Sequence, residues 1–119
     1  MDKRIGAQLY SLRTFLEKPE DLDPTFAKVA DIGYKTIQVS GLGPMPYSLI
    51  KEKADQHGLE IVCTHMGMDR YIHEIDSVIA DHKAMDCKIA GIGAMPGEYR
   101  EDLNALKKSI NHFNKFSEE

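Results

Sequence analysis

The chain has 119 residues, of which 42% are hydrophobic and 29% charged, with 15 Lys and Arg against 19 Asp and Glu and a net charge of −4. This length predicts a single globular domain that buries roughly two thirds of the surface its unfolded chain exposes. No apolar run approaches the ~20 residues of a membrane helix, and the first residues lack the apolar stretch of a signal peptide, so we expect a cytoplasmic protein without a membrane partner. Lys and Arg are scattered through an acidic chain, which predicts no nucleic-acid partner. Cys63 and Cys87 lack C-x-x-C spacing, so neither a disulfide framework nor a zinc module is indicated.

Four short β-rich runs occur along the chain, and each is followed by a turn and then a helical pattern of apolar residues. They span residues 5–10, 36–39, 60–64 and 88–92. Their starts are separated by 31, 24 and 28 residues, close to the roughly 31 residues per unit of an eight-unit barrel. Strands that alternate with helices form parallel sheets, so the sequence predicts an α/β fold of four βα units in one domain over residues 1–119. Two architectures fit this pattern, an open four-stranded sheet and half of a (β/α)8 TIM barrel with parallel strands.

Capping residues delimit the first two helices. Asp23 before Pro24 predicts an N-cap and a first helical position, and hence a helix over residues 24–32. Pro46 opens the second helix and Gly58 closes it.

The last two helices are predicted from apolar residues at three- and four-residue spacing. These positions are Ile72, Ile75, Ile79 and His82 in the third helix, and Tyr99, Leu103, Leu106, Ile110 and Phe113 in the fourth. The helical pattern continues to Glu118 and Glu119 without a capping residue, and two carboxylates at a helix C-terminus oppose the helix dipole. We therefore expect the chain to stop inside its fourth helix.

Three segments resemble, in the same order, one known family. They are Ile5-Gly6-Ala7-Gln8-Leu9-Tyr10-Ser11-Leu12-Arg13 at the first strand, Asp31-Ile32-Gly33-Tyr34-Lys35-Thr36-Ile37-Gln38-Val39 before and in the second, and His57-Gly58-Leu59-Glu60-Ile61-Val62-Cys63-Thr64-His65 before and in the third. Together they are similar to the sugar phosphate isomerase/epimerase family of xylose-isomerase-like TIM barrels. The resemblance covers nearly the whole chain.

The resemblance implies a barrel that uses a divalent metal, Mn, Mg or Zn, to move a proton next to a sugar carbonyl. In that family two glutamates act as acid and base, and they and most metal ligands follow strands five to eight. This chain has only the first four units. The resemblance therefore implies a sugar or sugar phosphate as ligand, but no catalytic residue, no bound metal and no activity for this chain alone.

The first strand and the loop after it supply three candidate substrate-binding residues. Gln8 and Tyr10 alternate with apolar neighbours, so both are predicted on the barrel-facing side of the first strand, where they can hydrogen-bond sugar hydroxyls. The alternative is a buried polar pair that serves the core. Arg13 follows in the loop and can bind a phosphate or carboxylate, whereas a lone loop arginine is more often solvated.

The second and third strands each end in a further candidate. Gln38 lies where many relatives carry a glutamate, and its neutral amide can orient a ligand but cannot act as a base. His65 ends the third strand, where related barrels use a histidine to bind substrate or a metal. The alternative is a histidine satisfied by the backbone. One histidine cannot hold a metal site by itself.

Two other functions remain open. Four βα units leave two open sheet edges, so two copies can close one barrel as a non-enzymatic homodimer held by these edges. A metal-dependent DNA repair barrel shares the same fold. Against it stand the absence of a basic patch and of a second strand-end histidine, since Gly93 and Ala94 follow the fourth strand.

Overall fold

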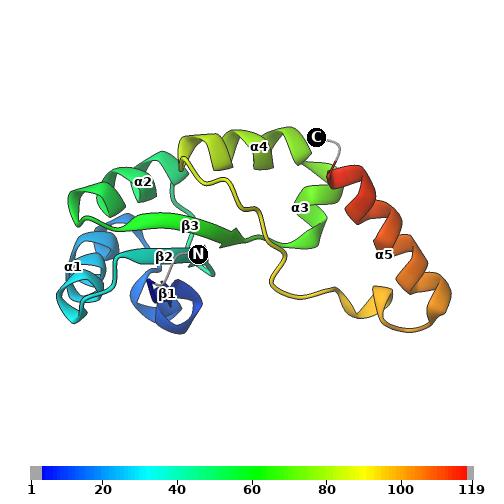
Figure 1. The fold of residues 1–119 in the computed structure, drawn as a ribbon, viewed down its shortest axis with the longest axis horizontal. Coiled ribbons are helices and arrows are strands. Elements are labelled where there is room, and N and C mark those ends of the chain that lie inside the picture. The colour runs from blue at the N-terminus through cyan, green and yellow to red at the C-terminus, as the bar shows by residue number, and fades with distance from the viewer. Residues whose placement is uncertain (1–3, 118–119) are drawn as a thin grey trace.

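The computed structural model describes residues 4–117 and shows a parallel sheet with helices beside it (Figure 1). The strands β1 (Gly6–Gln8), β2 (Thr36–Ser40) and β3 (Glu60–His65) lie in the order β1-β2-β3. The helices are α1 (Leu22–Ile32), α2 (Tyr47–Gln56), α3 (Met68–His73), α4 (Ile75–Ala84) and α5 (Leu103–Phe116), with 3-10 helices η1 (Leu9–Phe15), η2 (Pro19–Asp21) and η3 (Gly97–Tyr99). The first three residues and Glu118 and Glu119 lie outside the described part of the chain. The structure therefore does not test the expectations about a signal peptide and about the helix end at Glu118 and Glu119.

The centre of the sheet is β2, which is paired in parallel on both sides and has four of its five residues buried. α1 starts at Leu22, two residues before the predicted position, and ends at Ile32 as predicted, where Gly33 caps it in the left-handed conformation (φ 109°). The prediction that Asp23 is the N-cap is wrong. Its carboxylate accepts hydrogen bonds from Lys53 and His57 and ties α1 to α2.

The first strand is shorter than predicted. β1 ends at Gln8, and the chain turns into η1 at Leu9 instead of continuing as a strand to Tyr10. Leu9 and Leu16, one at each end of this 3-10 segment, are both fully buried. Within residues 4–117, β1 pairs only with β2, so few backbone hydrogen bonds oppose the turn into η1 that buries Leu9.

The predicted fourth strand over residues 88–92 is not a regular strand. The segment runs beside β3, and its carbonyl groups at Ile89 and Gly91 accept hydrogen bonds from the Thr64 and Met66 amides. A single parallel bridge joins Met66 to Ile92. No described residue pairs with the other side of the segment, and Ile89 is 61% exposed. A segment that has one neighbour and contains a glycine makes fewer ladder hydrogen bonds than a central strand.

The two C-terminal helical regions differ from the single helices predicted. The third divides at Glu74 into α3 and α4, and the fourth begins only at Leu103 because Tyr99 lies in η3. In Figure 1, α5 stands apart from the sheet at the end of a long extended segment coloured yellow and orange. The radius of gyration is 15.5 Å, above the about 13.5 Å of a compact domain of this length.

The core lies between the sheet and α1, α2 and α4. Its fully buried members include Phe26, Ile37, Leu59 and Met85. From α5, only Phe116 packs against this core, and it is partly buried. Among residues 4–117, no helix is long and apolar enough to cross a membrane.

Candidate functional site

The polar centre of the site is a contact between two neighbouring strands. An N–H of the Gln38 amide on β2 donates to the Nε2 atom of His65 on β3 over 2.7 Å. The imidazole is therefore neutral in this arrangement, with its proton on Nδ1. Both side chains are partly buried. The structure thus joins two of the predicted site residues. His65 ends β3, next to the edge of the sheet where ligands bind in parallel α/β folds, whereas Gln38 lies in the middle of β2, which continues to Ser40.

The His65 ring is held by two glycines from the segment after α4. A Cβ atom on Gly91 would lie 2.6 Å from the Thr64 carbonyl oxygen and 3.0 Å from the His65 Cδ2. A Cβ atom on Gly93 would lie 3.1 Å from the His65 Nδ1. The two glycines let the backbone pass directly over the imidazole. Gly91 lies within the predicted fourth strand and Gly93 directly after it, and glycine at such positions is a sequence signal for a close backbone approach.

Gln8 extends the polar row to β1. Its Cα atom is in register with that of Gln38, so the two side chains project from the same face of the parallel sheet. Gln8 is exposed and makes no described hydrogen bond through its side chain. Its amide is available to a ligand that sits across β1 and β2.

Tyr10 and Arg13 form a separate cluster on η1. The Arg13 guanidinium lies 4.4 Å from the centre of the Tyr10 ring and donates to the Tyr10 carbonyl oxygen over 2.9 Å. The Tyr10 ring lies against Gly41, where a Cβ atom would come within 2.6 Å of its Cδ2 atom. The prediction that Tyr10 lies on the barrel-facing side of the first strand is therefore wrong, because the chain leaves the strand before this residue. It lies instead over the loop that follows β2.

A cleft of about 450 Å³ adjoins His65 on the side of this loop. Its wall includes Ser40, Tyr47 and Arg70. Arg70 donates to Asp81 over 2.9 Å and to Glu74 over 3.1 Å, and the hydrogen bond to Asp81 is the main reason that its pKa is raised. Because the Arg70 guanidinium already binds two carboxylates, its role is to hold the wall of the cleft in place.

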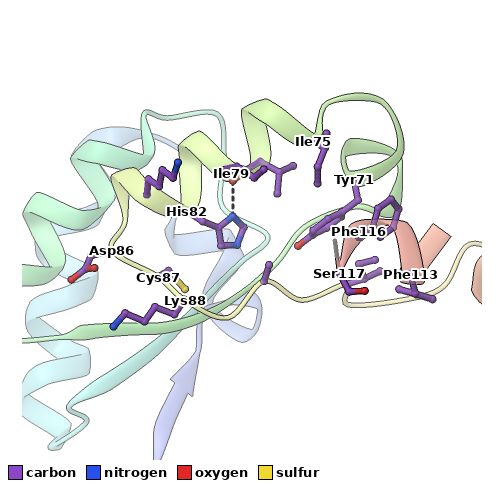
Figure 2. A pocket seen from close by; sticks show the side chains of 14 residues that line it. Tyr71, Ile75, Ile79, His82, Asp86, Cys87, Lys88, Phe113, Phe116 and Ser117 are labelled. Atoms are coloured by element: carbon purple, nitrogen blue, oxygen red, sulfur yellow. Dashed lines mark hydrogen bonds between the residues drawn. The ribbon is translucent and has the colours of Figure 1, made fainter. Parts of the chain in front are cut away.

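A second cavity, of about 530 Å³, has a different character (Figure 2). It lies between α4, the segment after it and the end of α5, and most of its wall is apolar. His82 contacts it, but this imidazole is buried and satisfied: Nδ1 donates to the Val78 carbonyl and the Thr64 hydroxyl donates to Nε2, both over 2.7 Å. The cavity is a gap between packed layers and lacks the converging polar groups of a sugar site.

The site does not contain the ligands of a metal ion. One imidazole and one amide meet there, and His65 Nε2 already accepts a hydrogen bond. No group of three His, Cys, Asp or Glu side chains within residues 4–117 has the geometry to hold a metal ion. A divalent cation normally needs at least three such ligands. The described residues therefore do not fit the metal implied by the family resemblance.

Comparison with solved structures identifies the fold. A sugar phosphate isomerase/epimerase from Parabacteroides distasonis ATCC 8503 matches 99% of this chain and 48% of its own, with 18% identity and a TM-score of 0.79. A second sugar phosphate isomerase/epimerase from that organism matches 98% of this chain and 50% of its own, with 21% identity and a TM-score of 0.68. An AP endonuclease, family 2, from Brucella melitensis matches 97% and 50%, with 18% identity and a TM-score of 0.68.

No protein-family model matches the chain, and no curated protein does. The chain spans about half the length of the solved structures that it matches. At these identities the comparison concerns the fold. The predicted fold class is confirmed: the chain has an α/β architecture with parallel strands that matches about half of a TIM barrel.

Proposed function

We propose that this chain is the substrate-binding half of a barrel that isomerises or epimerises a sugar or sugar phosphate. The observation that carries the proposal is the hydrogen bond between Gln38, in the middle of β2, and His65, at the carboxyl end of the adjacent parallel strand β3. Two of the solved structures with this fold are described as sugar phosphate isomerases/epimerases. An amide paired with a neutral imidazole offers both donors and acceptors, as a sugar with several hydroxyl groups requires.

Each candidate residue has a role in this proposal. The second N–H of Gln38, its carbonyl oxygen and the Nδ1–H of His65 bind hydroxyl or carbonyl oxygens of the sugar. Gln8 extends this contact along the ligand, because it projects from the same face as Gln38. Tyr10 supplies an aromatic face and Arg13 a positive charge that attracts a phosphate group.

The proton transfer itself lies outside these residues in our proposal. Neither Gln38 nor His65, as hydrogen-bonded here, is paired with a second acid or base, and the described residues offer no metal site. We propose that the intact barrel adds the divalent metal and the acid–base pair, and that this chain alone is inactive. A cytoplasmic location belongs to the same proposal and rests on the sequence alone.

Binding can be tested by NMR titration of the chain with pentoses, hexoses and their phosphates. We expect shifts centred on Gln38 and His65, and a His65→Ala variant that binds roughly fivefold more weakly, since a lost hydrogen bond costs about 1 kcal/mol. His73→Ala is the matched control, because His73 lies exposed on α3. The proposal fails if no sugar shifts these signals at about 10 mM, or if His73→Ala weakens binding as much as His65→Ala.

A further inference from the structure

Tyr71 on α3 connects parts of the molecule that lie far apart in the sequence. It is buried, and its ring packs against Phe116 of α5 with 5.6 Å between the ring centres (Figure 2). Its hydroxyl donates to the Gly91 carbonyl oxygen over 3.0 Å. Burial raises the pKa of Tyr71 above its usual 10.0, so the hydroxyl keeps its proton and remains a donor. The proposed sugar contacts do not include Tyr71, yet its hydrogen bond reaches the backbone that covers His65.

The Gly91 carbonyl oxygen accepts a second hydrogen bond, from the Met66 amide over 3.0 Å. One donor belongs to the backbone after β3 and the other to a side chain of α3, so two elements hold this peptide group. The surrounding segment over 88–92 is not a regular strand, and a single parallel bridge among the described residues joins Met66 to Ile92. A segment with so few backbone hydrogen bonds depends strongly on each contact that holds it.

The same stretch of backbone lies against the His65 imidazole. The Cβ position of Gly91 is 3.0 Å from the His65 Cδ2, and that of Gly93 is 3.1 Å from the His65 Nδ1. Packing this close leaves the ring no room to turn unless the backbone moves. The ring in turn accepts the Gln38 amide proton at Nε2 over 2.7 Å. The place of Gly91 therefore decides whether His65 keeps the orientation in which it meets Gln38.

The attachment of α5 involves Tyr71 as well. Among the described apolar residues of α5, Phe116 alone packs against the core, and most of the others are exposed. The contact with Phe116 limits the orientations of the Tyr71 ring. The hydroxyl points where the ring directs it, because both belong to one rigid group. A displacement of α5 therefore changes the direction of the hydroxyl that holds Gly91.

We propose that Tyr71 is a positioning residue for His65: its hydroxyl holds the Gly91 peptide against the imidazole, and its contact with Phe116 makes this hold depend on the position of α5. Tyr71 acts through the backbone and does not touch the ligand. The inference rests on the proposed function for its effect on sugar binding, whereas the orientation of the His65 ring is measured without any sugar. It assigns to α3 and α5 a part in shaping a site that lies on β2 and β3.

The first test follows two NMR signals of the unliganded 119-residue chain, the His65 ring and the Met66 amide. Tyr71→Phe keeps the aromatic ring and removes the hydroxyl. The His65 ring signals should move, and the Met66 amide should exchange roughly fivefold faster, since losing one hydrogen bond eases opening of the segment over 88–92 by about this factor. Tyr34→Phe is the matched control, because Tyr34 also packs against the core but its hydroxyl has no hydrogen-bond partner among the described residues.

The second test concerns the dependence on α5. Phe116→Leu keeps an apolar side chain and removes the ring contact with Tyr71, so the His65 ring signals should move as they do in Tyr71→Phe. Combined with Tyr71→Phe, it should move them little further, because the hydroxyl is already absent. Phe113→Leu makes the same change on the same helix, without a described contact to Tyr71, and should move the signals less. Circular dichroism establishes that each variant remains folded.

Titration of the same variants with sugars separates this inference from the proposed function. Tyr71→Phe should weaken sugar binding by less than the roughly fivefold expected for His65→Ala. Movement of the His65 signals in Tyr71→Phe, with no sugar bound by the unsubstituted chain, would support the positioning role and contradict the proposed function.

Four results would each overturn the positioning role. They are unchanged His65 signals in Tyr71→Phe, equal movement in Tyr34→Phe, equal effects of Phe116→Leu and Phe113→Leu, and sugar binding by Tyr71→Phe that is as tight as that of an unsubstituted chain shown to bind sugar.

Discussion

Residues 22–65 and residues 86–117 have similar sequence patterns but reach different degrees of order. The first region forms α1, β2, α2 and β3, and its central strand has neighbours on both sides. The second contains an equally β-rich run and a strongly amphipathic helix, yet the run forms one bridge and the helix exposes its apolar side. Local patterns of apolar residues therefore indicate which secondary structure a segment can form. Whether the segment forms it depends on the neighbouring elements that pair with it or cover it.

Burial explains the difference in physical terms. Ile37 and Val39 of β2 are at most 4% exposed, because α1 and α2 cover one face of the strand and two strands pair with its edges. Ile89 has the same apolar character but is 61% exposed. Each buried aliphatic side chain stabilises the fold by about 1.5–3 kcal/mol, so the first region holds most of the stabilising contacts.

The largest expected change in stability comes from removing one aromatic ring from each region. Phe26→Ala should destabilise the protein by about 3–5 kcal/mol, because Phe26 on α1 is fully buried. Phe113→Ala on α5 should cost less than about 1 kcal/mol in the monomer, because Phe113 is 38% exposed. Urea denaturation of dilute samples measures both. Similar costs for the two variants would contradict the conclusion that residues 22–65 contribute more to the core than residues 86–117 do.

The fold was predictable where apolar periodicity and capping residues coincided. β2 and β3 begin at the predicted residues, and α2 follows Pro46 as expected. The end of β1 was missed because Gln8-Leu9-Tyr10 alternates as a strand does, whereas the burial of Leu9 by a distant core induces a 3-10 turn. The spacing of apolar residues also gives no sign that the helical region divides at Glu74 into α3 and α4.

A smaller effect is expected at Gly91, a place where the second region is tightly packed. Gly91→Ala should cost about 1 kcal/mol, near the low end for overpacking, because the new methyl group meets the Thr64 carbonyl but the segment over 88–92 is free to shift. Gly97→Ala is the matched control, since nothing lies within 4 Å of its Cβ position. Thermal unfolding measures the difference. The His65 ring signals in NMR should move in Gly91→Ala alone, and unchanged signals would mean that Gly91 does not position this ring.

The positions of some residues of the candidate site were likewise predictable from the sequence, and those of others were not. Gln38 and His65 were predictable together, because both were predicted near the carboxyl ends of adjacent parallel strands, which meet at one edge of the sheet. The position of Tyr10 was not, since it depends on where β1 ends. The stacking of Arg13 on Tyr10, and of Tyr10 on Gly41, depends on the path of two loops that no periodicity describes.

The smallest expected effect concerns the ion pairs that tie α1 to α2 within the well-packed region. Hydrogen bonds from Lys53 and then His57 lower the pKa of Asp23 below its usual 3.8. A lowered folded-state pKa means that ionised Asp23 favours the fold, so its contribution is present above pH 3.8 and is lost as the pH falls through the lowered value. Asp23→Asn should therefore slightly reduce stability at pH 5 and reduce it less at pH 2, with the difference at pH 5 shrinking as salt is added, because the group is exposed to solvent. Urea midpoints of the two proteins at each pH measure this. An equal loss at both pH values would show that Asp23 acts through its shape and hydrogen bonds, and that its charge adds nothing to the link between the two helices.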